Sequence, residues 1–229
     1  NHVFDWSAPV TLLVLGLVLF LGIHSARIVA DDWRQQRLNT LGEAAWKGTY
    51  SLISVAGFAL LVWGYGVARQ TPVVLWVPPV ATRHAASLLM LLSFVLLTAA
   101  YVPRNALKQR LKHPMVLGVK VWALAHLLAN NTLADLLLFG SFLVWAVLDF
   151  RSARQRDRAA GTVYPPGTLR GTLIAVVAVF GLAMVPLPLT KVHVPTAGTV
   201  KELPFTTALV VGVHSCWSKP ASALGLFGS

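Results

Sequence analysis

The chain has a single cysteine, Cys216, among its 229 residues. One thiol cannot form an internal disulfide, a thiolate cluster or an iron–sulfur centre, so any protein-bound metal would rest on histidine. Charge is also scarce, since only 12% of the residues are Asp, Glu, Lys or Arg. With 56% hydrophobic residues and a mean hydropathy of +0.67, the composition excludes an ordinary soluble domain and indicates an integral membrane protein.

The sequence also lacks a Ser/His/Asp order, a phosphate-binding loop and paired catalytic carboxylates. Its formal net charge of +11 is carried by basic residues that gather in short loops between apolar runs. This pattern is typical of integral membrane proteins and differs from the basic face of a nucleic-acid-binding domain. The expected partner is therefore the lipid bilayer, and nucleic acid is excluded.

Six apolar runs approach the roughly 20 residues that a membrane-spanning helix needs. They cover about residues 8–30, 48–68, 83–101, 112–130, 133–150 and 169–189. Charged sequence, and no cleavage site of small residues, follows the first run, which we therefore expect to be a retained helix. The sequence predicts an all-α, polytopic integral membrane helix bundle with about six transmembrane helices.

The connectors carry further signals. Residues 31–47, DDWRQQRLNTLGEAAWK, predict a short interfacial helix after the first span, with Glu43 and Lys47 spaced for an ion pair. Asn130, Asn131 and Thr132 predict a tight turn and a helix cap, so the fourth and fifth spans should form an antiparallel hairpin.

Two features concern the spans themselves. Ser54, Gly57, Leu61 and Gly64 form a face of mostly small residues, which lets membrane helices approach closely. The carboxylates of Asp135 and Asp149 in the fifth run should face protein or an interface, and not lipid.

Lysine and arginine are concentrated in the first, third and fifth loops. The second loop has only Arg69 and Arg83, and the fourth has none. The positive-inside rule then predicts cytoplasmic odd-numbered loops and an amino terminus on the outer side of the membrane.

The bundle is expected over residues 1–190, and residues 191–229 form a divergent carboxyl-terminal segment. Within that segment LPFTTALVVGVHSCW, at 203–217, is apolar but too short for a span, which favours an interfacial or re-entrant position.

The fourth run carries two histidines. His113 stands before Pro114 at its start, and His126 lies thirteen residues further on, about 20 Å along a helix axis. Trp122 and Gly118 precede His126 at steps of four, so one face holds an imidazole, a flat aromatic and a small residue. That face could hold a planar cofactor, and ordinary helix packing explains it equally well.

Four long motifs occur together in this chain: HSARIVADDWR at 24–34, LGEAAWKGTYSLISVAGFALLVWGYGVAR at 41–69, TRHAA at 82–86 and KHPMVLGVKVWALAHLLAN at 112–130. Over about residues 10–170 they resemble the NnrU family of bacterial inner-membrane proteins, which is named for its association with nitrite and nitric oxide reduction genes. That family is also homologous to the plant 15-cis-zeta-carotene isomerase, a membrane protein that carries haem b. The last 40 residues depart from the family's usual ending.

The resemblance implies a haem b held between the histidine of the HS motif and that of the LAH motif, here His24 and His126. Trp122 would line the same site. Arg27, one turn after His24, would bind a haem propionate, or its side chain would extend to phospholipid. Asp135 would serve as the hydrogen-bond partner of a ligand histidine or simply as a helix cap.

Depth in the membrane favours a different pairing of these histidines. Because His24 lies in the inward half of the first span, it matches His113 in depth, whereas His126 matches His84 at the start of the third span. His84 and His113 are therefore the second choice as ligands. For both, a solvated or lipid-facing position at the interface is the ordinary alternative.

Three functions remain open. The first is a haem b-binding membrane protein in nitrite and nitric oxide metabolism, that is, denitrification. The second is a haem-dependent cis/trans isomerase of a carotenoid-like polyene. The third is a cofactor-free transporter or assembly factor, so whether the protein is an enzyme stays undecided.

Overall fold

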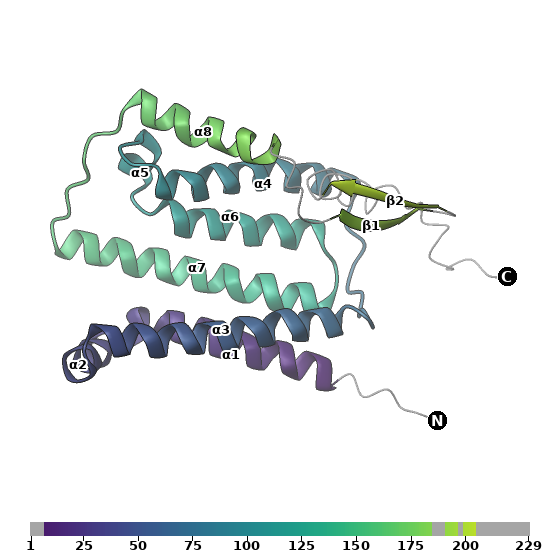
Figure 1. The fold of residues 1–229 in the computed structure, drawn as a ribbon, viewed down its shortest axis with the longest axis horizontal. Coiled ribbons are helices and arrows are strands. Elements are labelled where there is room, and N and C mark those ends of the chain that lie inside the picture. The colour runs from purple at the N-terminus through teal and green to yellow at the C-terminus, as the bar shows by residue number, and fades with distance from the viewer. Residues whose placement is uncertain (1–6, 185–190, 197–198, 205–229) are drawn as a thin grey trace. The chain divides into compact units, whose positions relative to one another are not determined.

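The computed structural model describes residues 7–184, 191–196 and 199–204 (Figure 1). Its contacts divide the chain into two units, Asn1–Ala175 and Val176–Ser229. The first unit contains most of the helices, and each unit is described by itself. The boundary expected at residue 190 stays a prediction.

Helices dominate the described residues, and the predicted helical membrane bundle is confirmed. Four helices are long and apolar enough to cross a membrane. They are α1 (Ser7–Val29), α3 (Glu43–Ala68), α4 (Val80–Tyr101) and α7 (Leu133–Ala159). The fourth and sixth predicted spans appear as shorter apolar helices, α6 (Pro114–Ala129) and α8 (Leu169–Met184).

The sixteen residues of α6 extend only about 24 Å, less than the roughly 30 Å of a bilayer's hydrocarbon core. Its ends are set by local chemistry. His113 occupies the N-cap position and Pro114 the first turn, where a missing N–H costs little. Asn130 ends the helix in an extended conformation.

Two short polar helices connect the apolar ones. The predicted interfacial helix is α2 (Asp31–Leu41), and Gly42, at a φ of 80°, separates it from α3. The expected ion pair then lies in the first turn of α3, with Lys47 Nζ 2.6 Å from Glu43 Oε1. The sequence did not predict α5 (Ala106–Leu111), whose N-cap Asn105 accepts a hydrogen bond from the Lys108 N–H at 2.7 Å.

The membrane helices of the first unit form two close pairs, α1 with α3 and α4 with α6, and α7 joins the pairs by contacting α1 and α6 (Figure 1). Gly57 and Gly64 are buried in the α1–α3 interface, as the small-residue face predicts. A Cβ on Gly64 would clash with the backbone of Leu13, and one on Gly16 with that of Leu61. The two backbones therefore touch, which explains the need for glycine on both helices.

The predicted turn and cap between α6 and α7 are confirmed. Thr132 is the N-cap of α7, and its hydroxyl accepts a hydrogen bond from the Asp135 N–H at 3.2 Å. In a second hydrogen bond the carboxylate of Asp135 accepts from the Thr132 N–H at 3.1 Å, and the two bonds together form a capping box. Asp135 is only 6% exposed, so it faces protein as expected.

Thr132→Ala should lower the free energy of unfolding by about 1 kcal/mol, because the mutant leaves a helix N–H without its side-chain acceptor. Unfolding in detergent micelles, followed by circular dichroism, measures this change. Thr40→Ala is the matched control, since the exposed hydroxyl of Thr40 bonds only to carbonyls of its own helix. Equal stability of Thr132→Ala and the parent would contradict the cap.

The described part of the second unit contains an antiparallel hairpin that the sequence did not predict. Strand β1 (Lys191–Thr196) pairs with β2 (Thr199–Pro204). The apolar stretch after it, 205–217, lies outside the described residues, so its interfacial or re-entrant placement stays a prediction.

The basic loops meet at one end of the first unit, which we call the basic end. Here α1 and α7 end, α3 and α6 begin, and α2 and α5 lie (Figure 1). Arg27, Arg34, Lys47 and Arg156 line one cavity at this end. The basic residues of the odd-numbered loops thus gather at one end of the helices, as the concentration of Lys and Arg in those loops predicted.

Candidate functional site

A cavity of 1060 Å³ opens at the basic end, between the ends of α1, α2, α3, α6 and α7. Its volume lies at the upper limit of ordinary cofactor and small-molecule sites, about 300–1,000 Å³. Aromatic, basic, acidic and imidazole groups share its wall. Its chemically most informative lining residues are His24, Arg27, Arg34, Trp46, Lys47, Tyr50, His113, Trp145, Asp149, Arg156 and Asp157.

His24 is fixed in the cavity wall by its own helix and by aromatic rings. Its Nδ1 lies 2.6 Å from the carbonyl oxygen of Phe20, one turn earlier in α1. Since a carbonyl only accepts, Nδ1 carries a proton, and in the neutral imidazole Nε2 keeps its lone pair. The rings of Tyr50 and Trp145 lie edge-on to the imidazole, with centroids 5.3 and 6.1 Å away. The bond from Nδ1 to a backbone carbonyl is one that metal-ligating histidines usually make through the ring nitrogen that does not bind the metal.

His113 lies on the same cavity, at the start of α6. Its Nε2 is 2.8 Å from Oδ2 of Asp157, in the last turns of α7. The carboxylate accepts this bond, so Nδ1 is the ring nitrogen with a lone pair when the imidazole is neutral. Tyr164 donates to the same oxygen at 2.9 Å. Partial burial and this bond raise the pKa of Tyr164 above its ordinary value.

Basic side chains surround the cavity, and two of them come from helices that face each other. Arg156 donates to the hydroxyl of Ser152 at 2.6 Å and reaches the backbone carbonyl of Arg27 at 3.5 Å. Arg27 and Arg156 therefore bring two guanidinium groups to the same wall. A ligand with carboxylate groups would be held there by charge-assisted hydrogen bonds.

Helix α7 contributes a part of this wall that was not predicted from the sequence. Trp145, Asp149, Ala153 and Asp157 lie at steps of four along that helix, and all line the cavity. The placement of Asp149 here confirms that it avoids lipid. The spacing of these residues was visible in the sequence, but nothing there showed which helix α7 would face.

His126 and Trp122 lie in a different environment. The imidazole of His126 stacks on the ring of Phe139 with centroids 4.3 Å apart and an interplanar angle of 6°. Trp122 meets His126 edge-on at 5.2 Å and Phe142 at 5.6 Å. Neither His126 nor Trp122 lines the basic-end cavity. Because Phe139 precedes Trp145 by six residues on α7, the positions of His126 and His24 differ by about 9 Å along that helix.

The hydrogen bonds of His126 also oppose metal ligation in this arrangement. The amide nitrogen of Asn130 donates to the backbone carbonyl of His126 at 3.0 Å, which fixes the orientation of the amide. The same nitrogen lies 3.2 Å from Nδ1 of His126. Nδ1 must then accept, so Nε2 carries the proton and no free lone pair remains. The structure thus does not bring His24 and His126 to one site.

The face of α6 that carries Gly118 could have held a planar cofactor or served ordinary helix packing, and at Gly118 the structure shows packing. Gly118 does not leave space beside Trp122, because a Cβ there would fall 2.9 Å from Cγ of Leu97 on α4. The Gly118 carbonyl also accepts a hydrogen bond from Ser93 of α4 at 2.8 Å. Gly118 therefore serves the α4–α6 contact, and α7 covers the face of Trp122 and His126.

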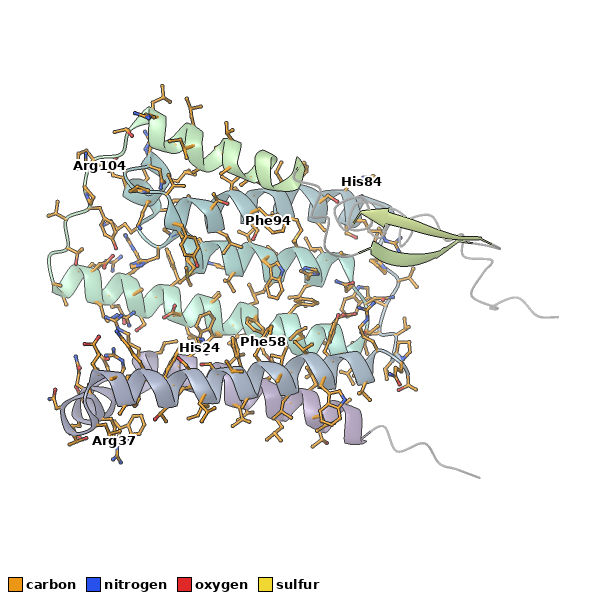
Figure 2. All side chains as sticks on the ribbon, viewed as in Figure 1. His24, Arg37, Phe58, His84, Phe94 and Arg104 are labelled. Atoms are coloured by element: carbon orange, nitrogen blue, oxygen red, sulfur yellow. The ribbon has the colours of Figure 1, made fainter. Side chains whose placement is uncertain are left out.

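His84 lies near the beginning of α4, far from His24 in the view of Figure 2. It is exposed and does not line the basic-end cavity. Depth in the membrane had suggested two pairs of histidines. His24 and His113 line the same cavity, whereas His84 and His126 do not line it.

The imidazoles of the cavity could serve a haem iron. No three His, Cys, Asp or Glu side chains within the described ranges come together as a metal-ion site. A haem iron needs only one or two imidazole nitrogens from the protein, since the porphyrin supplies the other four. His24, with its free Nε2, fits this requirement, and the adjacent guanidinium groups fit the propionates.

No curated protein and no solved structure matches the chain. The family model described as NnrU protein matches residues 12–200, which include every residue of the basic-end cavity. Helices of this length and hydropathy, together with a family match over most of the sequence, show that the chain is a membrane protein that belongs to the NnrU family.

Proposed function

We propose that this protein binds haem b in the basic-end cavity and takes part in nitrite and nitric oxide metabolism in the bacterial inner membrane. His24 would hold the iron through its Nε2, and His113 replaces His126 as the candidate for the other histidine ligand. The basic end faces the cytoplasm, in keeping with the positive-inside rule.

The observation that carries this proposal is the position of His24 in the cavity wall and the hydrogen bond that holds its ring there. Its Nδ1 is engaged by the Phe20 carbonyl at 2.6 Å, and the residue lines a cavity large enough for a cofactor. An imidazole held by a backbone carbonyl is pre-oriented and made more basic, as in many metalloproteins. The bond between His113 and Asp157 at 2.8 Å gives the second imidazole a comparable support.

The other lining residues would position the group. Arg27 and Arg156 would bind the propionates, while Trp46, Tyr50 and Trp145 would cover the porphyrin and exclude water. Bound haem supplies one-electron redox chemistry or a position for a diatomic ligand such as nitric oxide. Asp149 lies close enough to His24, His113, Arg27 and Arg156 for electrostatic interaction with them, so it would help to set the charge of the site.

An absorption spectrum of the full chain, purified in detergent from cells supplied with haem, tests the proposal. We expect a Soret band that co-purifies with the protein in a constant ratio. A preparation that lacks this band despite sufficient haem would reject both haem hypotheses and leave the cofactor-free transporter or assembly factor.

If haem is present, incubation of the reduced protein with a poly-cis carotene separates the two haem functions. Conversion of the polyene would support the isomerase, whereas spectral changes with nitric oxide alone would support the nitrogen-oxide function.

A further inference from the structure

A continuous row of aromatic rings leads from the basic-end cavity into the bundle. It starts at Trp145 in the cavity wall, whose ring centroid lies 6.1 Å from that of His24. The ring centroids of His24 and Phe20 are 4.3 Å apart, and those of Phe20 and Phe142 are 5.9 Å apart. These rings come from α1 and α7, and successive ring centroids are 6.1, 4.3 and 5.9 Å apart.

The same row continues towards the opposite end of the bundle. Phe142 meets Trp122 at 5.6 Å, Trp122 meets Phe139 at 5.1 Å, and Phe139 meets Tyr65 at 6.4 Å. Tyr65 belongs to the last turn of α3, and the guanidinium carbon of Arg69 lies 5.6 Å from its ring centroid. We call the series Trp145, His24, Phe20, Phe142, Trp122, Phe139 and Tyr65 the aromatic row.

The aromatic row contains the side chains that lose one electron most readily. Indole and phenol groups stand at its two ends and in its middle, as Trp145, Tyr65 and Trp122, with phenylalanine or histidine rings between them. Each step is a ring-to-ring contact within the 4.5–7 Å typical of aromatic pairs, or slightly closer. The geometry therefore offers a series of short ring-to-ring steps that links the three oxidisable groups.

Tyr65 also has a place for its proton. Its hydroxyl donates to Oδ1 of Asp135 at 2.6 Å. The other oxygen, Oδ2, accepts from the N–H and hydroxyl of Thr132 at 3.1 and 2.6 Å, so the carboxylate is held as an acceptor. A phenol that loses an electron becomes strongly acidic, and here its proton can pass directly to a base.

We propose that the aromatic row carries oxidising equivalents away from the cavity to Tyr65 and so protects the site against strong one-electron oxidants, such as nitrogen dioxide. The electron moves from Tyr65 through Trp122 and Trp145 to the oxidant, which becomes nitrite. The phenolic O–H bond breaks and its proton binds the Asp135 carboxylate, which leaves a neutral tyrosyl radical. The physiological role rests on the proposed function, because haem in the cavity is what would bring nitrogen oxides there.

A photo-oxidant in the cavity tests the route without haem. A ruthenium polypyridyl group is attached through Thr162→Cys, in the cavity lining, in a full-length Cys216→Ser protein reconstituted in nanodiscs. After a flash and quencher, we expect a tyrosyl radical in the electron paramagnetic resonance spectrum. The labelled parent also carries Tyr50→Phe and Tyr164→Phe, because these tyrosines lie in or beside the cavity and could be oxidised directly. Its signal should be lost in Tyr65→Phe and in Trp122→Phe, since the second variant keeps an aromatic ring but removes the middle oxidisable group.

Two matched variants control for unspecific oxidation. Tyr101 and Trp63 are 76% and 62% exposed and lie outside the aromatic row, so Tyr101→Phe and Trp63→Phe should keep the signal. Asp135→Asn should also reduce it, because the amide cannot accept the phenolic proton at neutral pH. Absence of a radical in the parent, or its persistence in Trp122→Phe, would overturn the proposal.

The outcome is separable from that of the haem experiment. A protein without a Soret band that still forms the Tyr65 radical would reject the cofactor and keep the route. A haem spectrum without the radical would reject the route alone.

Discussion

Replacing His24 by alanine is expected to abolish stable haem binding. The variant removes the imidazole whose Nε2 lone pair is free, while the cavity and its arginine residues remain. Haem content per protein, measured from the Soret absorbance and from the pyridine haemochrome, should fall to the background of a membrane protein without haem. Loss of an axial ligand changes the coordination of the iron as well as its affinity.

Two controls make this result specific. His193→Ala changes a histidine of the hairpin in the second unit and should leave the spectrum as in the parent. Imidazole added to His24→Ala should restore part of the haem spectrum if the site itself is intact. A parental spectrum in His24→Ala would remove this residue from the account.

Gly64→Leu should disrupt the pairing of α1 and α3. A Cβ at this position would clash with backbone atoms of Leu12 and Leu13, and backbone cannot move aside as a flexible side chain can. Overpacking of this kind costs about 1–3 kcal/mol even for small additions, and leucine adds three further carbon atoms. We expect loss of the folded protein, or a thermal midpoint far below that of the parent, in a fluorescence-detected size-exclusion assay.

The same helix provides the control for this substitution. Gly66 lies two residues further on, is exposed, and has no atom within 4 Å of an added Cβ. Gly66→Leu should therefore fold like the parent, because its side chain would meet lipid. If both variants were equally stable, the close contact between the α1 and α3 backbones would be wrong.

The fold was largely predictable because its determinants are local in sequence. Apolar length predicted the helices, and Thr132 after two asparagines predicted the turn and cap that the structure shows. The lengths of α6 and α7 were less predictable. Helix α7 continues nine residues beyond the apolar run that ended at Phe150, and these last turns are polar. Apolar length therefore could not predict where the helix ends.

The site was predictable only in part, since it depends on which helices face each other. Sequence identified His24 and Arg27, and the structure places both on the cavity. Depth along the membrane grouped His24 with His113, and both residues line the cavity. The resemblance grouped His24 with His126, but the stacking on Phe139 and the bond from Asn130 could not be foreseen from the chain alone.

The contribution of α7 explains the rest of the difference. Trp145, Asp149 and Asp157 face the cavity because α7 lies between the two helix pairs (Figure 1). Periodicity shows that these residues share one side of a helix, but it does not show what that side meets. Short loops bring consecutive helices together, whereas the contact between α1 and α7 joins distant parts of the sequence.

The haem content of His113→Ala and His126→Ala, purified in parallel from haem-supplied cells, tests most directly whether the basic-end cavity holds the cofactor. The structure predicts a lowered haem content or a five-coordinate spectrum for His113→Ala, because that residue shares the cavity of His24. His126→Ala should keep the parental spectrum, since its ring stacks on Phe139 outside the cavity. The opposite result, with haem lost from His126→Ala and retained by His113→Ala, would contradict the account.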